Sequence, residues 1–260
     1  MRHAALVGCA IGALTAGAVT AALGSRSGEK PTPVLGALPR RVAPAFAPGP
    51  ARPLGSLRHV TRWAPVRRAA IARREPAAHA APVTRVGTKT PEGTTNIVRV
   101  LGRRADAAGA LWVKVGLATL PNGRAGWLPR TVLGGYGSVD THLVVDVERF
   151  TATLRMAGRV VFRARVGVGQ ARWPTARGRF YIRNRLTRFA GATYGPLAFG
   201  TSARSEHLTD WPGGGFIGIH GTDEPQLIPG PISHGCIRMR NRDILALAKL
   251  MPIGTPLTIS

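Results

Sequence analysis

The chain has few cysteines and few acidic residues. Its 260 residues include two cysteines, Cys9 and Cys236, and 12 aspartates and glutamates against 36 lysines and arginines, which gives a formal charge of +24. Because Cys9 falls in the first apolar run, Cys236 is the one thiol in the part expected to fold, and an internal disulfide framework is excluded there. Aromatic residues make up only 6% of the chain and do not alternate with the arginines, and zinc-finger spacings are absent. Binding to nucleic acid is therefore not expected.

An apolar run opens the chain. Residues 4–23, AALVGCAIGALTAGAVTAAL, carry no charge and follow Arg2 and His3. A run of this length is enough to span a bilayer. It also fits an export signal, with small residues near Gly24 for cleavage. Residues 1–24 are thus predicted to be either a signal peptide or a membrane anchor. In both cases the rest of the chain is expected outside the cytoplasm, in the cell wall or periplasm.

A proline-rich segment follows, from residue 25 to residue 82. Its prolines recur at spacings that neither a helix nor a strand tolerates. We therefore expect a disordered tether, extended by up to about 3.1 Å per residue. The arginines between Arg58 and Arg74 have no acidic residue among them. Either compositional bias explains them, or they attract the segment to an anionic lipid or wall polymer.

Residues 83–134 regain the pattern of strands. Residues 97–101 and 110–118 form two short β-prone runs, the Asn122-Gly123 pair is a strong turn signal, and Trp127 restarts apolar sequence. The stretches WVKV and PNGRAGWLP resemble a bacterial SH3-like domain. The resemblance implies a small β-barrel that either binds wall glycopeptide or acts as a packing spacer.

Residues 139–260 are predicted to form a second, mostly β domain with one helix. Three strand runs separated by turns indicate an antiparallel meander, and they lie at 143–147, 151–155 and 160–166. A later buried strand, FIGIH, delivers His220 at its end. The stretch NRDILALAKLM has apolar residues at helical spacing, and Asn241 is in position to cap the helix.

Cys236 and the histidines near it are the residues best suited to catalysis by a nucleophilic thiol. A thiol becomes a good nucleophile when an imidazole takes its proton or stabilises the thiolate. His234 is two residues away, and His220 is brought in from a strand end. Gly235 allows close approach of the backbone, so its N–H and that of Cys236 are candidates to stabilise an oxyanion.

Two other interpretations of these residues stay open on chemistry alone. A lone cysteine is often a small buried apolar residue, although the neighbours of Cys236 are polar or glycine. Zinc is the other alternative, with His220, His234 and Cys236 as ligands and His207 as a conjectural fourth. The spacing of these residues is not typical of zinc sites, so thiol catalysis is favoured.

The stretch IHGTDEPQLIPGPISHGCIRM resembles the signature of L,D-transpeptidases with a YkuD-type catalytic domain. That signature is a His-Gly, a variable loop, and then Ser/Thr-His-Gly-Cys, an apolar residue and Arg or Asn. The stretch WPTARGRF is similar to the Pro-Thr-Pro-x-Gly-x-Phe of the family, with Ala176 in place of the second proline. The similarity covers residues 139–260. It implies a β-sandwich with one helix for this domain.

The resemblance implies a role for each matching residue. Cys236 is the nucleophile, and His220 is the general acid and base, oriented by the backbone carbonyl of Gly221. His234 and Gly235 shape the site and the oxyanion pocket. Ser233 and Arg238 support the loop or contact a substrate carboxylate. No metal and no organic cofactor is implied.

The implied activity is that of a peptidoglycan L,D-transpeptidase. Cys236 attacks the carbonyl of the third stem residue, a diamino acid, in a tetrapeptide donor, and the terminal D-amino acid leaves. The side-chain amine of another stem then takes the acyl group, which gives a 3→3 cross-link. Water as the acceptor would give carboxypeptidase activity instead. An inactive wall-binding protein of the same fold and a zinc peptidase are the alternatives.

Overall fold

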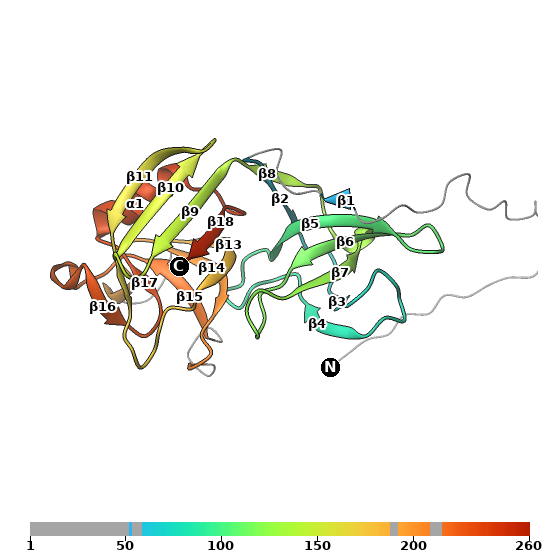
Figure 1. Cartoon of the computed structure of the whole chain (residues 1–260), viewed down its shortest axis with the longest axis horizontal. Coiled ribbons are helices and arrows are strands. Elements are labelled where there is room, and N and C mark those ends of the chain that lie inside the picture. The colour runs from blue at the N-terminus through green and yellow to red at the C-terminus, as the bar shows by residue number, and fades with distance from the viewer. Residues whose placement is uncertain (1–51, 54–58, 188–191, 209–214) are drawn as a thin grey trace, which may run out of the picture. The chain divides into compact units, whose positions relative to one another are not determined.

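The computed structural model describes residues 52–53, 59–187, 192–208 and 215–260 (Figure 1). The predicted signal or anchor at 1–24 lies outside the described residues, and so do positions 25–51 and 54–58 of the predicted tether. Within the part described, none of the helices has the length and apolar character needed to cross a membrane.

An N-terminal β module forms one eight-stranded sheet. Its strands are hydrogen-bonded in the order β4-β3-β7-β6-β5-β2-β8, with β1 beside β5. The strands are β1 (Arg52–Pro53), β2 (Thr61–Pro65), β3 (Ala70–Arg73), β4 (Pro82–Val86), β5 (Ile97–Ala105), β6 (Leu111–Gly116), β7 (Ala125–Pro129) and β8 (Gly137–Val139), with a 3₁₀ turn at Arg130–Val132. The strand runs expected from the sequence correspond to β5 and β6. Gly123, at φ +80°, lies in the expected turn before β7.

The module begins earlier than the sequence predicted, so the linker boundary at residue 82 is wrong. Strand β2 pairs with β5 and β8, and β3 pairs with β4 and β7. Ala64, Val66 and Ala72 are buried in the module's core. Pro65 is the last residue of β2, and its carbonyl accepts the N–H of Gly134 at 2.8 Å. Part of the arginine-rich segment is therefore folded sheet. Its attraction to anionic polymers and the SH3-like resemblance stay predictions.

The C-terminal domain is mostly β, as predicted, with one α-helix among the described residues. Its strands are hydrogen-bonded in the order β11-β10-β9-β18-β13-β14-β15-β17-β12-β16. The elements are β9 (Thr141–Asp146), β10 (Thr151–Met156), β11 (Arg159–Arg165), β12 (Gly167–Gly169), β13 (Gly178–Leu186), β14 (Ala198–Arg204), β15 (Phe216–His220), β16 (Gly230–Ser233), β17 (Ile237–Arg238), α1 (Asn241–Leu250) and β18 (Pro256–Ile259), with 3₁₀ turns at Ala192–Tyr194 and Pro225–Leu227.

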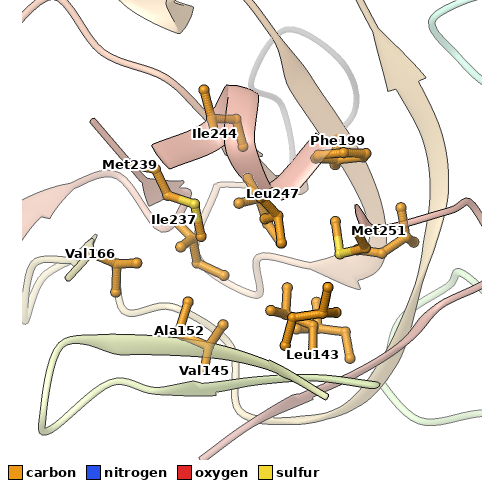
Figure 2. Packing of buried hydrophobic residues seen from close by; sticks show 14 of the residues in the cluster. Leu143, Val145, Ala152, Val166, Phe199, Ile237, Met239, Ile244, Leu247 and Met251 are labelled. Carbon is orange, nitrogen blue, oxygen red and sulfur yellow. The ribbon is translucent and has the colours of Figure 1, made fainter. Parts of the chain in front are cut away.

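Strand β13 joins the two halves of this domain. Its first part, Gly178–Tyr181, pairs with β18, and its second part, from Ile182, pairs with β14. Buried side chains of both halves and of α1 form one hydrophobic core. Figure 2 shows Leu247 of α1 directed toward the side chains of Leu143 and Val145 on β9. Burial of this apolar surface, at roughly 25 cal/mol per Å², is the main force that holds the halves together.

The predicted meander and helix are present, but the role expected for Asn241 is wrong. The residue that flanks the helix is Arg240, and no side chain caps it. Asn241 is the first helical residue instead. Its Oδ1 accepts the backbone N–H of Thr222 at 2.9 Å, so it holds the loop that follows His220.

Hydrogen bonds join the module to the C-terminal domain. Arg183 on β13 is 2% exposed, and its Nη2 lies 3.3 Å from Glu92 Oε1 of the module. Asn184 Nδ2 donates to the other carboxylate oxygen of Glu92 at 3.0 Å. Burial raises the pKa of Glu92, but Arg183 and hydrogen bonds from Thr90 and Asn184 outweigh it and hold the pKa below its ordinary value. Glu92 is therefore the counter-ion of a buried arginine.

Replacement of Glu92 by glutamine should lower the free energy of unfolding by about 3 kcal/mol, because it leaves the Arg183 guanidinium buried without its counter-ion. Urea denaturation measures the change. Glu148→Gln is the matched control, since its partner Arg177 and Glu148 itself are 56% and 76% exposed. We expect no measurable change there. Equal destabilisation by both substitutions would contradict the assignment.

Candidate active site

Strand β15 carries His220 to the site. Ile217 and Ile219 are buried in the core, and successive side chains of a strand point to opposite faces. Phe216, Gly218 and His220 are therefore presented on the other face of the strand. His220, at the end of β15, is 3% exposed.

The turn between β16 and β17 carries Cys236. Ser233 Oγ donates to the carbonyl of Cys236 at 2.6 Å and accepts the N–H of Gly235 at 3.1 Å. Gly235 has a φ of +114°, a conformation that favours glycine. Ser233 thus fixes the turn, in keeping with the supporting role implied for it. Because the Gly235 N–H donates to Ser233 Oγ, it is not available in this conformation to stabilise an oxyanion, the role that the sequence had predicted for it.

Parallel pairing of β15 with β17 brings the thiol to the imidazole. His220 is the partner of Arg238 and Ile219 is the partner of Ile237, so Cys236 lies beside Gly218. The Gly218 N–H lies 3.4 Å from Cys236 Sγ. A Cβ added to Gly218 would lie 3.9 Å from that sulfur and 4.0 Å from His220 Cδ2. The thiol and the imidazole therefore border the same space, and the absence of a side chain at Gly218 keeps it open.

Sequence reasoning missed Gly218. A glycine inside a strand pattern is a signal of close approach to the backbone, and FIGIH contains one. Its partner, however, is set by the β15–β17 register, which the sequence did not reveal.

The imidazole of His220 is held in one orientation. Its Nδ1 lies 2.6 Å from the carbonyl oxygen of Gly221, an acceptor, so Nδ1 carries the proton and Nε2 is left as the base. Burial lowers the pKa of His220 to about 4, Arg238 adds to this, and the Gly221 hydrogen bond and Asp223 oppose it. The ring of Tyr194 lies 4.8 Å away, centroid to centroid. His220 is therefore neutral at neutral pH.

The thiol of Cys236 is neutral as well. Burial raises the pKa of Cys236, and the Gly218 N–H and the charge of Arg238 only partly offset this. The side chain is nevertheless partly exposed, so a reagent can reach it. A neutral thiol beside a neutral imidazole favours proton transfer during attack over a standing thiolate–imidazolium pair.

A cavity of about 80 Å³ contains both groups. It is lined by Thr193, Tyr194, Ser205, Leu208, Gly215, Phe216, Ile217, His220, Ser233, His234, Cys236 and Arg238. Every side chain predicted for the site thus borders one pocket. The Arg183 guanidinium lies 3.7 Å from the centroid of the Phe216 ring, so the arginine held by the module also supports a wall of this pocket.

Arg238 and His234 have different surroundings. Arg238 Nη1 lies 2.9 Å from Glu224 Oε2, which ties β17 to the loop between β15 and β16. His234 is exposed, and its ring lies against Trp173 at 4.3 Å between centroids. In the described part of the chain, no group of three or more His, Cys, Asp or Glu side chains is arranged to hold a metal ion. The zinc arrangement considered for His220, His234 and Cys236 is therefore not found there.

Thr175 is a second residue that sequence reasoning did not single out. Its hydroxyl accepts the N–H of Gly169 at 2.8 Å and donates to the carbonyl of Gly235 at 2.9 Å. The side chain is buried. Thr175 therefore ties the end of β12 to the turn that carries Cys236. The signal available was its position in WPTARGRF, which the resemblance used without assigning Thr175 a role.

Replacement of Thr175 by valine should lower the free energy of unfolding by about 2 kcal/mol, because the buried Gly235 carbonyl and the partly buried Gly169 N–H each lose their partner. The looser turn should also change the rate at which iodoacetamide alkylates Cys236. Urea denaturation and intact mass measure the two effects. Thr175→Ser keeps the hydroxyl and should retain the wild-type alkylation rate. Identical behaviour of the two variants would rule out the hydroxyl as the cause.

Solved structures with some similarity include two L,D-transpeptidases. The Enterococcus faecium enzyme is 23% identical, with a TM-score of 0.37, over 46% of this chain and 49% of that one. The Mycobacterium smegmatis enzyme is 13% identical, with a TM-score of 0.39, over 76% of this chain and 99% of that one. The present chain thus spans about half the length of the Enterococcus faecium protein.

Sequence comparisons identify the C-terminal domain. Residues 140–259 match the family model of the YkuD L,D-transpeptidase catalytic domain. The YkuD protein of Bacillus subtilis is 36% identical over 123 residues, which are 47% of this chain and 68% of that protein. The YkuD protein of Bacillus licheniformis is 34% identical over 132 residues, 50% of this chain and 73% of that protein. The chain therefore belongs to the L,D-transpeptidase family with the YkuD-type catalytic domain.

Proposed function

We propose that this protein is a peptidoglycan L,D-transpeptidase that forms 3→3 cross-links through a Cys236 acyl-enzyme and acts outside the cytoplasm. One observation carries the proposal. The thiol of Cys236 and the buried, neutral imidazole of His220 face one space across Gly218, in a domain of this family. Membership of the family supports stem peptides as the substrates.

Acylation is the first step of the proposed reaction. His220 Nε2 takes the Sγ proton as the sulfur attacks the carbonyl carbon of the third stem residue in a tetrapeptide donor. The backbone N–H of Cys236 is the proposed donor to the oxyanion. The amide C–N bond then breaks, His220 returns the proton to the departing nitrogen, and the terminal D-amino acid leaves. The product is a thioester at Cys236.

Transfer to the acceptor completes the cycle. The side-chain amine of a diamino acid in a second stem attacks the thioester, and His220 Nε2 accepts the proton that the amine loses. The C–S bond breaks, and the departing sulfur regains its proton from His220. One new amide joins the third residues of two stems. In this proposal Ser233 and Arg238 hold the turn and the adjoining loop, through the contacts with Gly235 and Glu224.

A reconstituted reaction tests the proposal. The purified protein is incubated with a tetrapeptide donor and an amine acceptor stem, and in parallel with a carbapenem, each with and without EDTA. Mass spectrometry should find the 3→3 dimer, the released D-amino acid and an adduct on the peptide that contains Cys236, in equal amount with the chelator. Tripeptide as the only product would favour the carboxypeptidase. Absence of both adduct and product would refute a thiol enzyme, and loss with EDTA would favour a metal enzyme.

A further inference from the structure

A second cavity, of about 660 Å³, lies away from the thiol and is rich in arginine. It is lined by His59, Thr61, Arg99, Val100, Leu101, Asp140, Thr141, His142, Arg155, Gly158, Arg179, Pro256, Leu257 and Thr258. None of these residues borders the pocket of Cys236. Because no step of the proposed transpeptidation uses them, the charge gathered here needs a separate explanation.

The basic side chains form a row across four neighbouring strands. Arg155 on β10 is the register partner of His142 on β9, and Arg179 on β13 is the partner of Thr258 on β18. His142 Nε2 and Thr258 Oγ1 lie 2.9 Å apart, so a hydrogen bond links the Arg155–His142 pair to the Thr258–Arg179 pair. The adjacent residues on these strands point into the core, so this row occupies the opposite face. Arg99 of β5 adds a third guanidinium from the module.

The cluster lacks matching negative charge. Among the described residues, none of the three arginines forms an ion pair with a carboxylate. Arg99 Nε is buried and makes no hydrogen bond, and Arg155 Nη1 reaches only the carbonyl of Gly158, at 3.2 Å. Asp140 is the one acidic residue in the lining. Three guanidinium groups against one carboxylate leave an excess of two positive charges, with His142 neutral.

The groups are close enough to repel one another. Burial lowers the pKa of Arg99, and the charge of Arg179 lowers it further. Burial also lowers the pKa of His142, with added contributions from Arg99, Arg155 and Arg179. Two positive charges held close together, such as those of Arg99 and Arg179, repel each other. Such an arrangement is therefore unfavourable unless an anion occupies it.

We propose that this cavity binds a phosphate group carried on a larger organic ligand. Guanidinium groups match phosphate oxygens with paired, charge-assisted hydrogen bonds, and the hydroxyls of Thr61 and Thr258 are further donors at the wall. The excess charge suits a doubly charged phosphate monoester. The cavity is far larger than a phosphate ion, so the ligand has an organic part that occupies the rest of it.

Calorimetric titration of the purified protein with glycerol phosphate, inorganic phosphate and succinate tests this inference. Succinate carries the same double charge without a phosphate. We expect glycerol phosphate to bind at least tenfold more tightly than succinate and more tightly than inorganic phosphate. Equal affinity for succinate would overturn the phosphate assignment. Binding to anionic phospholipid vesicles without binding to glycerol phosphate would overturn the cavity as the site.

Two variants and a matched control locate the binding. Arg99→Gln and Arg179→Gln should each weaken glycerol phosphate binding by at least tenfold, since each removes one guanidinium from the cluster. Arg103 lies on the same strand as Arg99, is exposed and does not border the cavity. The Arg103→Gln variant should therefore bind glycerol phosphate as the wild type does. Wild-type affinity in both cluster variants, measured on protein with an unchanged thermal unfolding midpoint, would refute the proposal.

Discussion

Replacement of Cys236 by alanine should abolish both acylation and cross-linking, with a fall in rate of at least about 10³-fold. The proposed reaction runs through a thioester at Sγ, and the substitution removes that one atom. The folded state should be little affected, because sulfur is only a weak acceptor for the Gly218 N–H. Intact mass after carbapenem treatment and the yield of cross-linked dimer are the measurements.

Cys9→Ala is the control for this prediction, because it removes the other thiol of the chain. That variant should keep the wild-type adduct and the wild-type rate. Cys236→Ser is the more demanding comparison. A hydroxyl is a far weaker acid than a thiol, so the weakly basic imidazole of His220 should not activate it, and the rate should fall nearly as far as in the alanine variant. An adduct that survives in Cys236→Ala but is lost in Cys9→Ala would exclude Cys236 as the nucleophile.

Local pattern was enough to predict much of the C-terminal domain. The strands β9, β10 and β11 are short runs rich in β-branched and apolar residues and are divided by short turns, so they could be predicted from neighbouring residues alone. The helix was predictable for the same reason. The start of the module was not, because β2 and β3 are only five and four residues long and lie in a stretch of chain where prolines and arginines recur. Their strand character depends on pairing with β5 and β7, far along the chain.

Some residues of the candidate site could be predicted from local sequence, and others could not. Cys236 and His220 were found because each belongs to a short motif with its own chemistry. Thr175 and Gly218 act through contacts with residues distant in sequence, so only the folded chain identifies them. Asn241 was misassigned because the position before a helix usually supplies a cap. Here the side chain accepts a hydrogen bond from Thr222 instead, a partner that depends on how the start of α1 lies against the loop after β15.

The rate of acylation of the free protein should be constant between about pH 5 and about pH 8 and should fall roughly tenfold per unit in more acidic solution. The reason is the pKa of His220, which burial lowers to about 4. Above that pH the imidazole is neutral and its Nε2 accepts the thiol proton. Below it the imidazole is already protonated and cannot act as the base. Carbapenem acylation at low concentration, followed by intact mass across the pH range, gives the profile.

The pH at which the rate falls, together with the pH dependence of alkylation, distinguishes a neutral thiol–imidazole pair from a thiolate–imidazolium pair. A fall centred near pH 6.5 would mean that His220 has its ordinary pKa and is not desolvated as the structure indicates. A standing thiolate–imidazolium pair would behave differently, since its thiolate would persist into acid and alkylation by iodoacetamide would stay fast there. The raised pKa of Cys236 predicts instead that alkylation slows as the pH falls from alkaline values.

Replacement of His220 by glutamine should remove the acid limb and lower the acylation rate by about 10²- to 10⁴-fold, the usual contribution of a positioned base. The thiol remains in this variant, so the residual reaction depends on the small fraction of thiolate. That fraction rises with pH toward the raised pKa of Cys236, and the residual rate should rise roughly tenfold per unit with it. His234→Gln is the matched control, because His234 is exposed beside Trp173. The His234→Gln variant should show the same fall in rate at acid pH as the wild type. Loss of that fall in His234→Gln would mean that His234, and not His220, is the base.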